Sequence, residues 1–222
     1  MLVLVGSGEY LPAMESVDRD LISRLNEPPR VACLPTAAGQ EGAERIAYWS
    51  RLGVDHFSRL GAQVEAIPVI DRTSAKDAAL AAAIARANFV YLSGGRPDYL
   101  YMTLEKSLAW EAILSILAGG GMLAGCSAGA MILGQRFFGF PGWKPGFNLL
   151  PGTTIVPHYD EVPEDLVKLW RVLTGHDLTL LGVEGNTALV HSNGQYEVVG
   201  SGGVTVWNKV SKTRHTHGPL SL

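Results

Sequence analysis

The 222-residue sequence has only two cysteines, no run of basic residues and no long apolar segment. Cys33 and Cys126 both lie in apolar runs, so we predict buried thiols and no disulfide framework. A formal net charge of −3 without a basic cluster argues against a nucleic acid or an anionic membrane as partner. No segment approaches a membrane-spanning length, and the first residues lack the basic region of a signal peptide. We therefore expect one cytoplasmic domain over residues 1–222, with a small molecule as its partner.

Apolar, strand-like runs alternate five times with helical segments before residue 127. The alternation predicts an α/β fold, a three-layer sandwich around a mainly parallel central sheet. A helix near residues 17–25 follows the first strand, and the long helix over 41–60 has an interruption near Gly53. The predicted strands are 2–5, 30–34, 64–69, 89–92 and 122–126, and the later helices are 75–87 and 107–117.

The last third of the sequence has a different character. Residues 137–157 are rich in glycine, proline and aromatics, which fits either a loop that walls a pocket or a packed surface excursion. A helix over 163–173 should end at Gly175. Strands are predicted at 178–183 and 187–191, and Asn193-Gly194 is typical of a hairpin turn into 196–199. With a last strand at 204–207, we expect a C-terminal β-hairpin added to the sheet.

The central motif is Gly125-Cys-Ser-Ala-Gly, where an apolar strand meets a predicted helix over 128–133. This G-x-S-x-G pattern is typical of a nucleophile elbow, in which small neighbours let the chain turn sharply and expose the serine hydroxyl. Ser127 would attack an acyl group, and the Ala128 amide would then donate to the resulting oxyanion. The alternative is a strand-to-helix turn that is small only for steric reasons, and the pattern alone leaves both open.

The stretch from residue 128 to 157 contains neither aspartate nor glutamate, which excludes an acid between Ser127 and His158 in chain order. Among six histidines we favour His158 as the base, because it follows an apolar run, and strand ends meet the ligand crevice of an open α/β sheet. Glu184 follows the next apolar strand in the same way and is the predicted acid. Asp160 and Glu161 are nearer to His158 in sequence, but they precede a predicted helix, and capping of its N-terminus is a sufficient explanation for both acids.

Four segments together resemble the S51 serine peptidases, a family that includes cyanophycinase and the aspartyl dipeptidases. They are Tyr91-Leu-Ser-Gly-Gly-Arg, Gly125-Cys-Ser-Ala-Gly-Ala, Pro157-His-Tyr and Gly182-Val-Glu-Gly-Asn-Thr-Ala-Leu. The resemblance implies a flavodoxin-like fold related to the class I glutamine amidotransferases. It also implies Ser127 as nucleophile, His158 as base, Glu184 as orienting acid, and the Gly95 and Ala128 amides as the oxyanion hole. The family tends to carry two adjacent acids where this chain has Glu184 followed by Gly185.

The expected substrate is a small peptide or isopeptide that contains aspartate, bound at Gly94 and Arg96. Arg96 could pair bidentately with a substrate carboxylate, or simply face solvent. Two other functions stay open: an esterase-type hydrolase, whose acid would be Asp160 or Glu161 and whose base His176 or His191, and a catalytically silent binding protein. We predict no metal, since His215-Thr-His217 lies in a polar tail, and no nucleotide cofactor at Gly6 and Gly8. A homodimer is possible.

Overall fold

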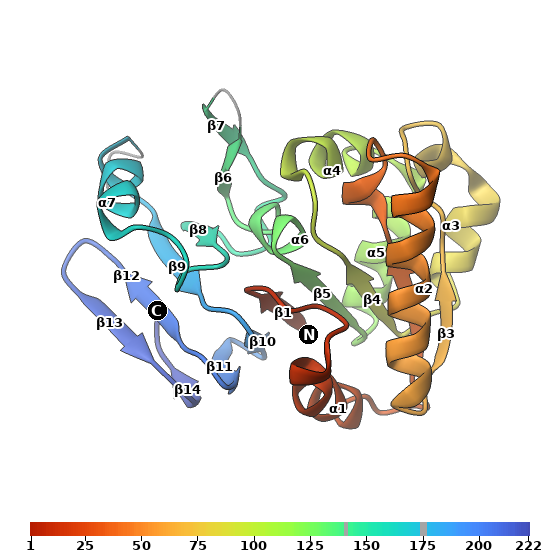
Figure 1. Ribbon diagram of the computed structural model, residues 1–222, viewed down its shortest axis with the longest axis horizontal. Coiled ribbons are helices and arrows are strands. Elements are labelled where there is room, and N and C mark those ends of the chain that lie inside the picture. The colour runs from red at the N-terminus through yellow and green to blue at the C-terminus, as the bar shows by residue number, and fades with distance from the viewer. Residues whose placement is uncertain (140–141, 174–176) are drawn as a thin grey trace.

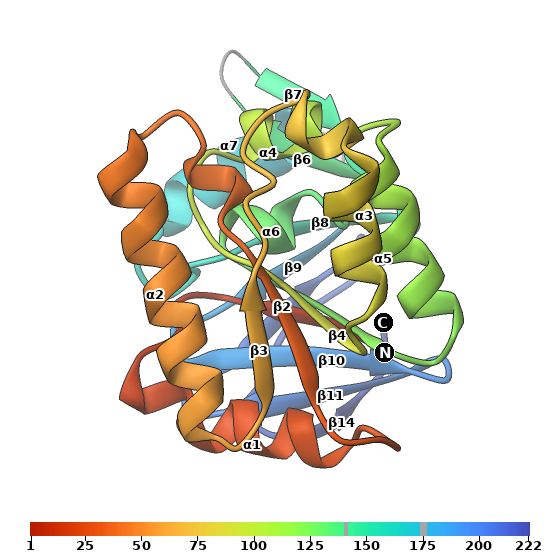
Figure 2. The ribbon, with the colours of Figure 1, turned by 90° about the vertical axis from the view of Figure 1, so that its right-hand side faces the viewer.

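The computed structural model describes residues 1–139, 142–173 and 177–222. Its main feature is an eight-stranded sheet in the order β14-β11-β10-β1-β5-β4-β2-β3 (Figures 1 and 2). The five strands from β1 to β3 in this order are parallel to their neighbours, and β10, β11 and β14 extend the sheet antiparallel. The strands are β1 (Leu2–Val5), β2 (Arg30–Leu34), β3 (Gln63–Ala66), β4 (Phe89–Leu92), β5 (Met122–Cys126), β10 (Thr187–Ser192), β11 (Gln195–Gly200) and β14 (Gly218–Leu220).

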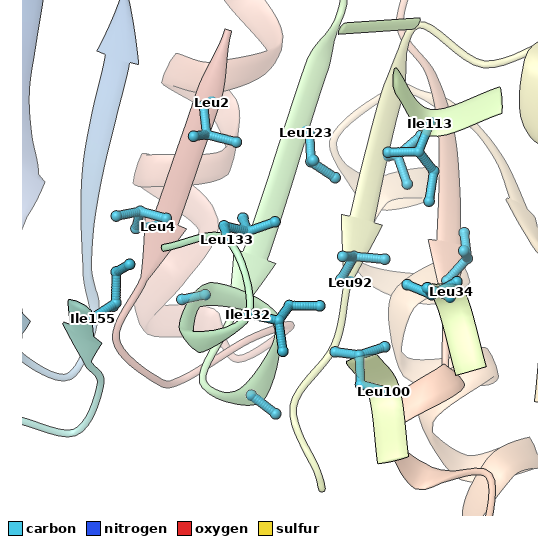
Figure 3. Packing of buried hydrophobic residues seen from close by; sticks show 14 of the residues in the cluster. Leu2, Leu4, Leu34, Leu92, Leu100, Ile113, Leu123, Ile132, Leu133 and Ile155 are labelled. Carbon is cyan, nitrogen blue, oxygen red and sulfur yellow. The ribbon is translucent and has the colours of Figure 1, made fainter. Parts of the chain in front are cut away.

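Helices cover both faces of this sheet, as the alternating pattern predicts. On one face, Val3, Val5 and Phe89 pack with Val17 of α1 and Phe57 of α2. The residues that alternate with them along the strands join a larger core under the other helices (Figure 3). The predicted α/β class is therefore confirmed. The helices are α1 (Glu15–Ser23) and α2 (Ala43–Arg59) on the first face, and α3 (Ala78–Ala85), α4 (Pro97–Leu104), α5 (Leu108–Ala118) and α6 (Ala128–Met131) on the second; 3₁₀ turns span Pro12–Met14, Thr36–Ala38 and Ser74–Lys76.

A second sheet, in the order β13-β12-β9-β8, lies beside the first (Figure 1). The C-terminal β-hairpin expected at Asn193-Gly194 is confirmed, because β10 and β11 pair antiparallel and extend the first sheet beside β1. The strands expected at 178–183 and 204–207 are present too, but they belong to the second sheet. Part of the expected loop over 137–157 also forms strands, and the polar tail after residue 207 contributes two more. The strands of the second sheet are β8 (Thr153–Val156), β9 (Thr179–Val183), β12 (Val204–Trp207) and β13 (Lys212–His215), and α7 (Glu164–Leu173) lies between β8 and β9 in the sequence. β6 (Arg136–Gly139) and β7 (Gly142–Pro145) form a separate two-stranded sheet.

Two helix predictions also need correction. Helix α2 continues through Gly53 without interruption. A Cβ there would lie 2.9 Å from the Cys33 sulfur, so the glycine allows close packing on β2 and does not break the helix. Helix α3 begins at Ala78, later than expected, because the Asp77 side chain accepts the N–H groups of Ala79 and Leu80 as an N-cap. Gly175, the predicted end of α7, lies outside the described residues.

No helix among the described residues has the length and apolar character needed to cross a membrane.

Candidate active site

Ser127 lies at the carboxyl end of β5, where the chain turns into α6. Its backbone has φ 50° and ψ −112°, a conformation that costs energy for a residue with a side chain. The N–H of Ser127 donates to the Val5 carbonyl at 3.0 Å, which ties the turn to the end of β1. Strain of this kind persists only where the surroundings impose it, and it is common at nucleophile elbows.

Gly125 and Gly129 are required by close backbone packing around this turn. A Cβ on Gly125 would overlap the Gly129 carbonyl, and a Cβ on Gly129 would lie 2.5 Å from the Leu92 carbonyl oxygen on β4. The small residues of the motif therefore have the steric role that the alternative interpretation gave them. They also present the Ser127 side chain at the carboxyl end of β5, so the steric and the catalytic interpretations describe one arrangement.

Helix α6 is shorter than expected and spans only Ala128–Met131. A single turn has little macrodipole, so any stabilisation of an oxyanion here must come from individual N–H groups. No hydrogen bond of the Ala128 N–H is found within the described residues. Its position, directly after the serine, fits the geometry of an oxyanion donor.

His158 follows β8, the edge strand of the second sheet, and its Nε2 lies 3.1 Å from the Ser127 Oγ. Its backbone also has a positive φ, 50°. The Tyr159 N–H donates to the Val183 carbonyl at 3.1 Å, which fixes the turn that carries the imidazole against β9. The two residues with the expected nucleophile and base chemistry therefore meet within hydrogen-bond distance, each on a strained turn.

Glu184 does not lie where the prediction requires it. Both of its carboxylate oxygens accept from Arg214, at 2.6 Å from Nε and 2.7 Å from Nη2, and no contact with His158 is found among the described residues. The bidentate hydrogen bonds from Arg214 hold the pKa of Glu184 below its usual value of 4.5. A carboxylate bound in this way is already paired. The expected contact between Glu184 and the His158 imidazole is therefore replaced in the structure by the pair of Glu184 with Arg214.

The acid beside the other imidazole nitrogen is Glu161, whose Oε2 lies 3.5 Å from the His158 Nδ1. The pair is open to solvent, with the Glu161 side chain 67% exposed. Asp160 is used differently, since its Oδ1 accepts the Gly185 N–H at 2.8 Å. Asp160 thereby ties the loop after β8 to the loop after β9.

The loop between β4 and α4 carries the other predicted residues. Gly95 has φ 141°, and a Cβ there would lie 2.7 Å from the Ala37 carbonyl oxygen, so only glycine fits. No acceptor for the Gly95 N–H is found within the part of the chain that the structure describes. The Gly94 N–H, in contrast, donates to Glu9 at 2.9 Å. The Arg96 guanidinium donates to Gln40 at 2.7 Å, and no ion pair of Arg96 is found among the described residues.

The other histidines of the described residues have different surroundings. His56 is fully buried and bound to Asp18 at 2.8 Å, and His191 stacks on Tyr196 within the antiparallel part of the sheet. His176 lies outside the described residues. His215 is the last residue of β13, so the segment that we interpreted as a solvated tail is partly a strand.

Sequence reasoning missed Glu9 and Arg214. Glu9 follows the glycine turn after β1, at the edge where parallel strands end, and that position was the available signal. Arg214 had no signal, because its contact with Glu184 depends on the pairing of β9 with β12 and of β12 with β13.

Comparison with known proteins decides the family. A model of peptidase family S51 matches residues 2–199. The chain belongs to this family. Among its curated relatives, the cyanophycinases of Synechococcus elongatus and Thermosynechococcus vestitus are each 26% identical over 213 residues. The match takes in 86% of this chain but only 64% of each cyanophycinase, so this S51 chain spans somewhat under two thirds of their length.

Solved structures show the same fold over the full S51 chain. A peptidase from an acI-B1 Actinobacterium is 33% identical and superposes with a TM-score of 0.89, covering 100% of this chain and 96% of that one. A putative peptidase E protein from Listeria monocytogenes has a TM-score of 0.63 at 18% identity, with 97% of each chain covered, and supports the fold alone.

Proposed function

We propose that this S51 chain is a serine-type peptidase that cleaves a small aspartate-containing peptide or isopeptide. The observation that carries the proposal is the 3.1 Å contact between the Ser127 Oγ and the His158 Nε2 at a strained elbow. In the proposed reaction, His158 takes the proton of Ser127 as the oxygen attacks the carbonyl. The imidazolium gives that proton to the departing amine as the peptide bond breaks, which leaves the acyl-enzyme. Water then attacks the acyl-enzyme with His158 again as the base, and the Ser127 oxygen leaves and regains its proton.

The Gly95 and Ala128 N–H groups are the proposed oxyanion donors. Gly95 lies on the loop between β4 and α4, Ala128 begins α6 directly after Ser127, and neither N–H has an acceptor among the described residues. Donors without an internal partner can bind a developing negative charge at no cost in broken hydrogen bonds.

Glu161 is the proposed carboxylate for the His158 imidazole, in place of Glu184. An acid near Nδ1 favours the tautomer whose Nε2 accepts the serine proton, and it stabilises the imidazolium that follows. At 3.5 Å and in solvent, this ion pair is weak in the free protein. Catalytic contacts of this kind often tighten when substrate binds.

The preference for aspartate rests on Arg96. Arg96 follows Gly95, and the one side-chain partner found for its guanidinium within the described residues is the neutral amide of Gln40, so its charge is available for a substrate carboxylate. A charged hydrogen bond contributes about 1.5 to 3 kcal/mol, which corresponds to a preference in kcat/KM of roughly ten- to a hundredfold.

A panel of matched aspartyl, β-aspartyl and asparaginyl dipeptides tests both parts of the proposal. The wild-type chain should hydrolyse aspartyl substrates faster than their asparaginyl matches. Arg96→Ala should remove that preference more than it lowers the rate on neutral substrates. Gln40→Ala is the matched control, because it removes the internal partner of Arg96 and keeps the guanidinium. If the chain hydrolyses no member of the panel, the proposed activity is refuted. Equal rates on the aspartyl and asparaginyl series would refute the role of Arg96.

A further inference from the structure

Glu9 is a buried acid next to the proposed site, and nothing in the proposed chemistry uses it. It lies in the turn after β1, with 9% of its surface exposed. Its Oε1 accepts the Gly94 N–H at 2.9 Å, and its Oε2 accepts from the Cys126 sulfur at 3.0 Å. One carboxyl group therefore joins the loop before α4 to the residue that precedes the serine.

The packing around Gly94 shows how close this carboxyl group is to the nucleophile. A Cβ built on Gly94 would lie 2.7 Å from the Glu9 Oε1 and 3.2 Å from the Ser127 Cβ. Gly94 is thus in contact with both side chains, and a larger residue would displace one of them. The glycine at this position leaves room for the hydrogen bond from its N–H to Glu9.

The Gly94-Gly95 segment needs such a contact because glycine has few conformational restraints of its own. The Glu9 hydrogen bond fixes the peptide unit immediately before the one that carries the Gly95 N–H. On the other side, the Arg96 N–H donates to the Ala37 carbonyl at 3.1 Å. The peptide unit between these two contacts is the one whose N–H must face the oxyanion.

We propose that Glu9 is a positioning residue, which orients the Gly95 N–H toward the oxyanion by accepting the Gly94 N–H. This inference rests on the proposed peptidase activity. Glu9 itself does not contact the substrate in this account. The positioning role requires a buried acceptor oxygen at the place of Oε1. It does not require the negative charge of the carboxylate, because a negative charge close to a developing oxyanion would destabilise that oxyanion.

The sulfur contact is secondary in this account. Cys126 is fully buried, and burial first, then the negative charge of Glu9, raise the pKa of its thiol. The protonated thiol donates to Oε2 and holds the carboxyl group from the side away from Gly94. Cys126→Ala is therefore a matched control, because it removes one of the two contacts of Glu9 and leaves the contact with Gly94.

The test measures kcat and KM for Glu9→Ala, Glu9→Gln and Cys126→Ala on the best peptide substrate, together with inhibition by a matching peptide aldehyde. The aldehyde forms a tetrahedral adduct on the serine and so reports oxyanion binding. Glu9→Ala should lower kcat by about 10- to 100-fold, below the full cost of removing one oxyanion donor, because the donor is displaced and not deleted. Its KM should stay within about threefold, and aldehyde inhibition should weaken by the same factor as kcat.

Glu9→Gln keeps the acceptor oxygen and should stay within about threefold of wild-type kcat, as should Cys126→Ala. A wild-type kcat in folded Glu9→Ala would overturn the proposal, and so would a loss in Glu9→Gln as large as that in Glu9→Ala. If Glu9→Ala does not fold, Glu9→Asp replaces it. The shorter side chain withdraws the carboxyl group from Gly94, so kcat should fall, and an unchanged kcat would refute the positioning role.

The same measurements separate this inference from the proposed function. A wild-type rate no higher than that of Ser127→Ala on every substrate would refute the peptidase activity and the inference with it. A wild-type rate that depends on Ser127 but not on the acceptor at position 9 would refute the inference alone.

Discussion

The proposed nucleophile and base come from two different parts of the molecule. Ser127 is built into the parallel sheet, where glycine contacts with neighbouring backbone fix its position. His158 is held by the smaller sheet on a turn at its edge, and its side chain is 40% exposed. The position of Ser127 is fixed by close backbone packing, whereas the position of His158 is fixed by a few hydrogen bonds. Substitutions at the elbow should therefore have larger effects than substitutions around the imidazole.

Ser127→Ala should have the largest effect on activity. Loss of the attacking oxygen should lower kcat/KM by a factor on the order of 10⁴ or more, while the fold is retained. Steady-state hydrolysis and thermal unfolding of the same preparation check both halves of this expectation. Residual activity above about a tenth of wild type would contradict the assignment of the nucleophile.

Substitution of Glu161 should mainly change kcat, whereas substitution of Glu184 should mainly change stability. Glu161→Gln should lower kcat by about three- to tenfold, a modest loss because the ion pair is solvent-exposed. Glu184→Gln should lower the melting temperature, since it breaks a bidentate pair with Arg214, and should leave kcat nearer to wild type. Paired measurements of kcat and melting temperature on both variants test this. A larger loss of kcat in Glu184→Gln than in Glu161→Gln would restore Glu184 as the catalytic acid.

The ion pair of Glu184 with Arg214 should make the unfolding free energy of the chain fall in acid. The pKa of Glu184 is held below its usual value of 4.5 by Arg214, so this carboxylate binds a proton less readily in the folded chain than in the unfolded chain. Its stabilising contribution is complete above pH 4.5 and is lost as the pH falls through the lowered pKa. Unfolding free energies between pH 6 and pH 3, about the range of the transition, should show a steeper fall for wild type than for Glu184→Gln. Equal slopes would contradict the ion pair.

Cys126→Ala should have the smallest effect on the chemistry. The thiol is buried, and burial raises its pKa, so little thiolate is present to attack a substrate or a reagent at neutral pH. The native chain should resist iodoacetamide and keep its activity during the treatment. Loss of turnover in step with alkylation of Cys126 would move the nucleophilic role from oxygen to sulfur.

The parallel part of the fold was predictable from sequence because its signals are local. Buried runs such as 122–126, and the small residues around Ser127, reveal both a strand and the turn that follows it. The smaller sheet was not predictable in the same way. Its β8 is a short, half-apolar strand inside a segment rich in glycine, proline and aromatics, and β13 is exposed and polar, so neither pattern indicates a second sheet. The pairing of Glu184 with Arg214 depends on that sheet, so no pattern in the sequence indicates it, whereas the contact of Ser127 with His158 joins two residues that each follow a recognisable strand.

Peptide mapping after treatment with a fluorophosphonate tests the central claim most directly. The reagent bonds covalently to a serine only when a nearby base activates the hydroxyl. We predict a single modified peptide, labelled at Ser127, in the wild-type chain, and labelling slowed by at least about a hundredfold in His158→Ala. Unlabelled Ser127 in the folded wild-type chain, or equal labelling rates with and without His158, would contradict the account.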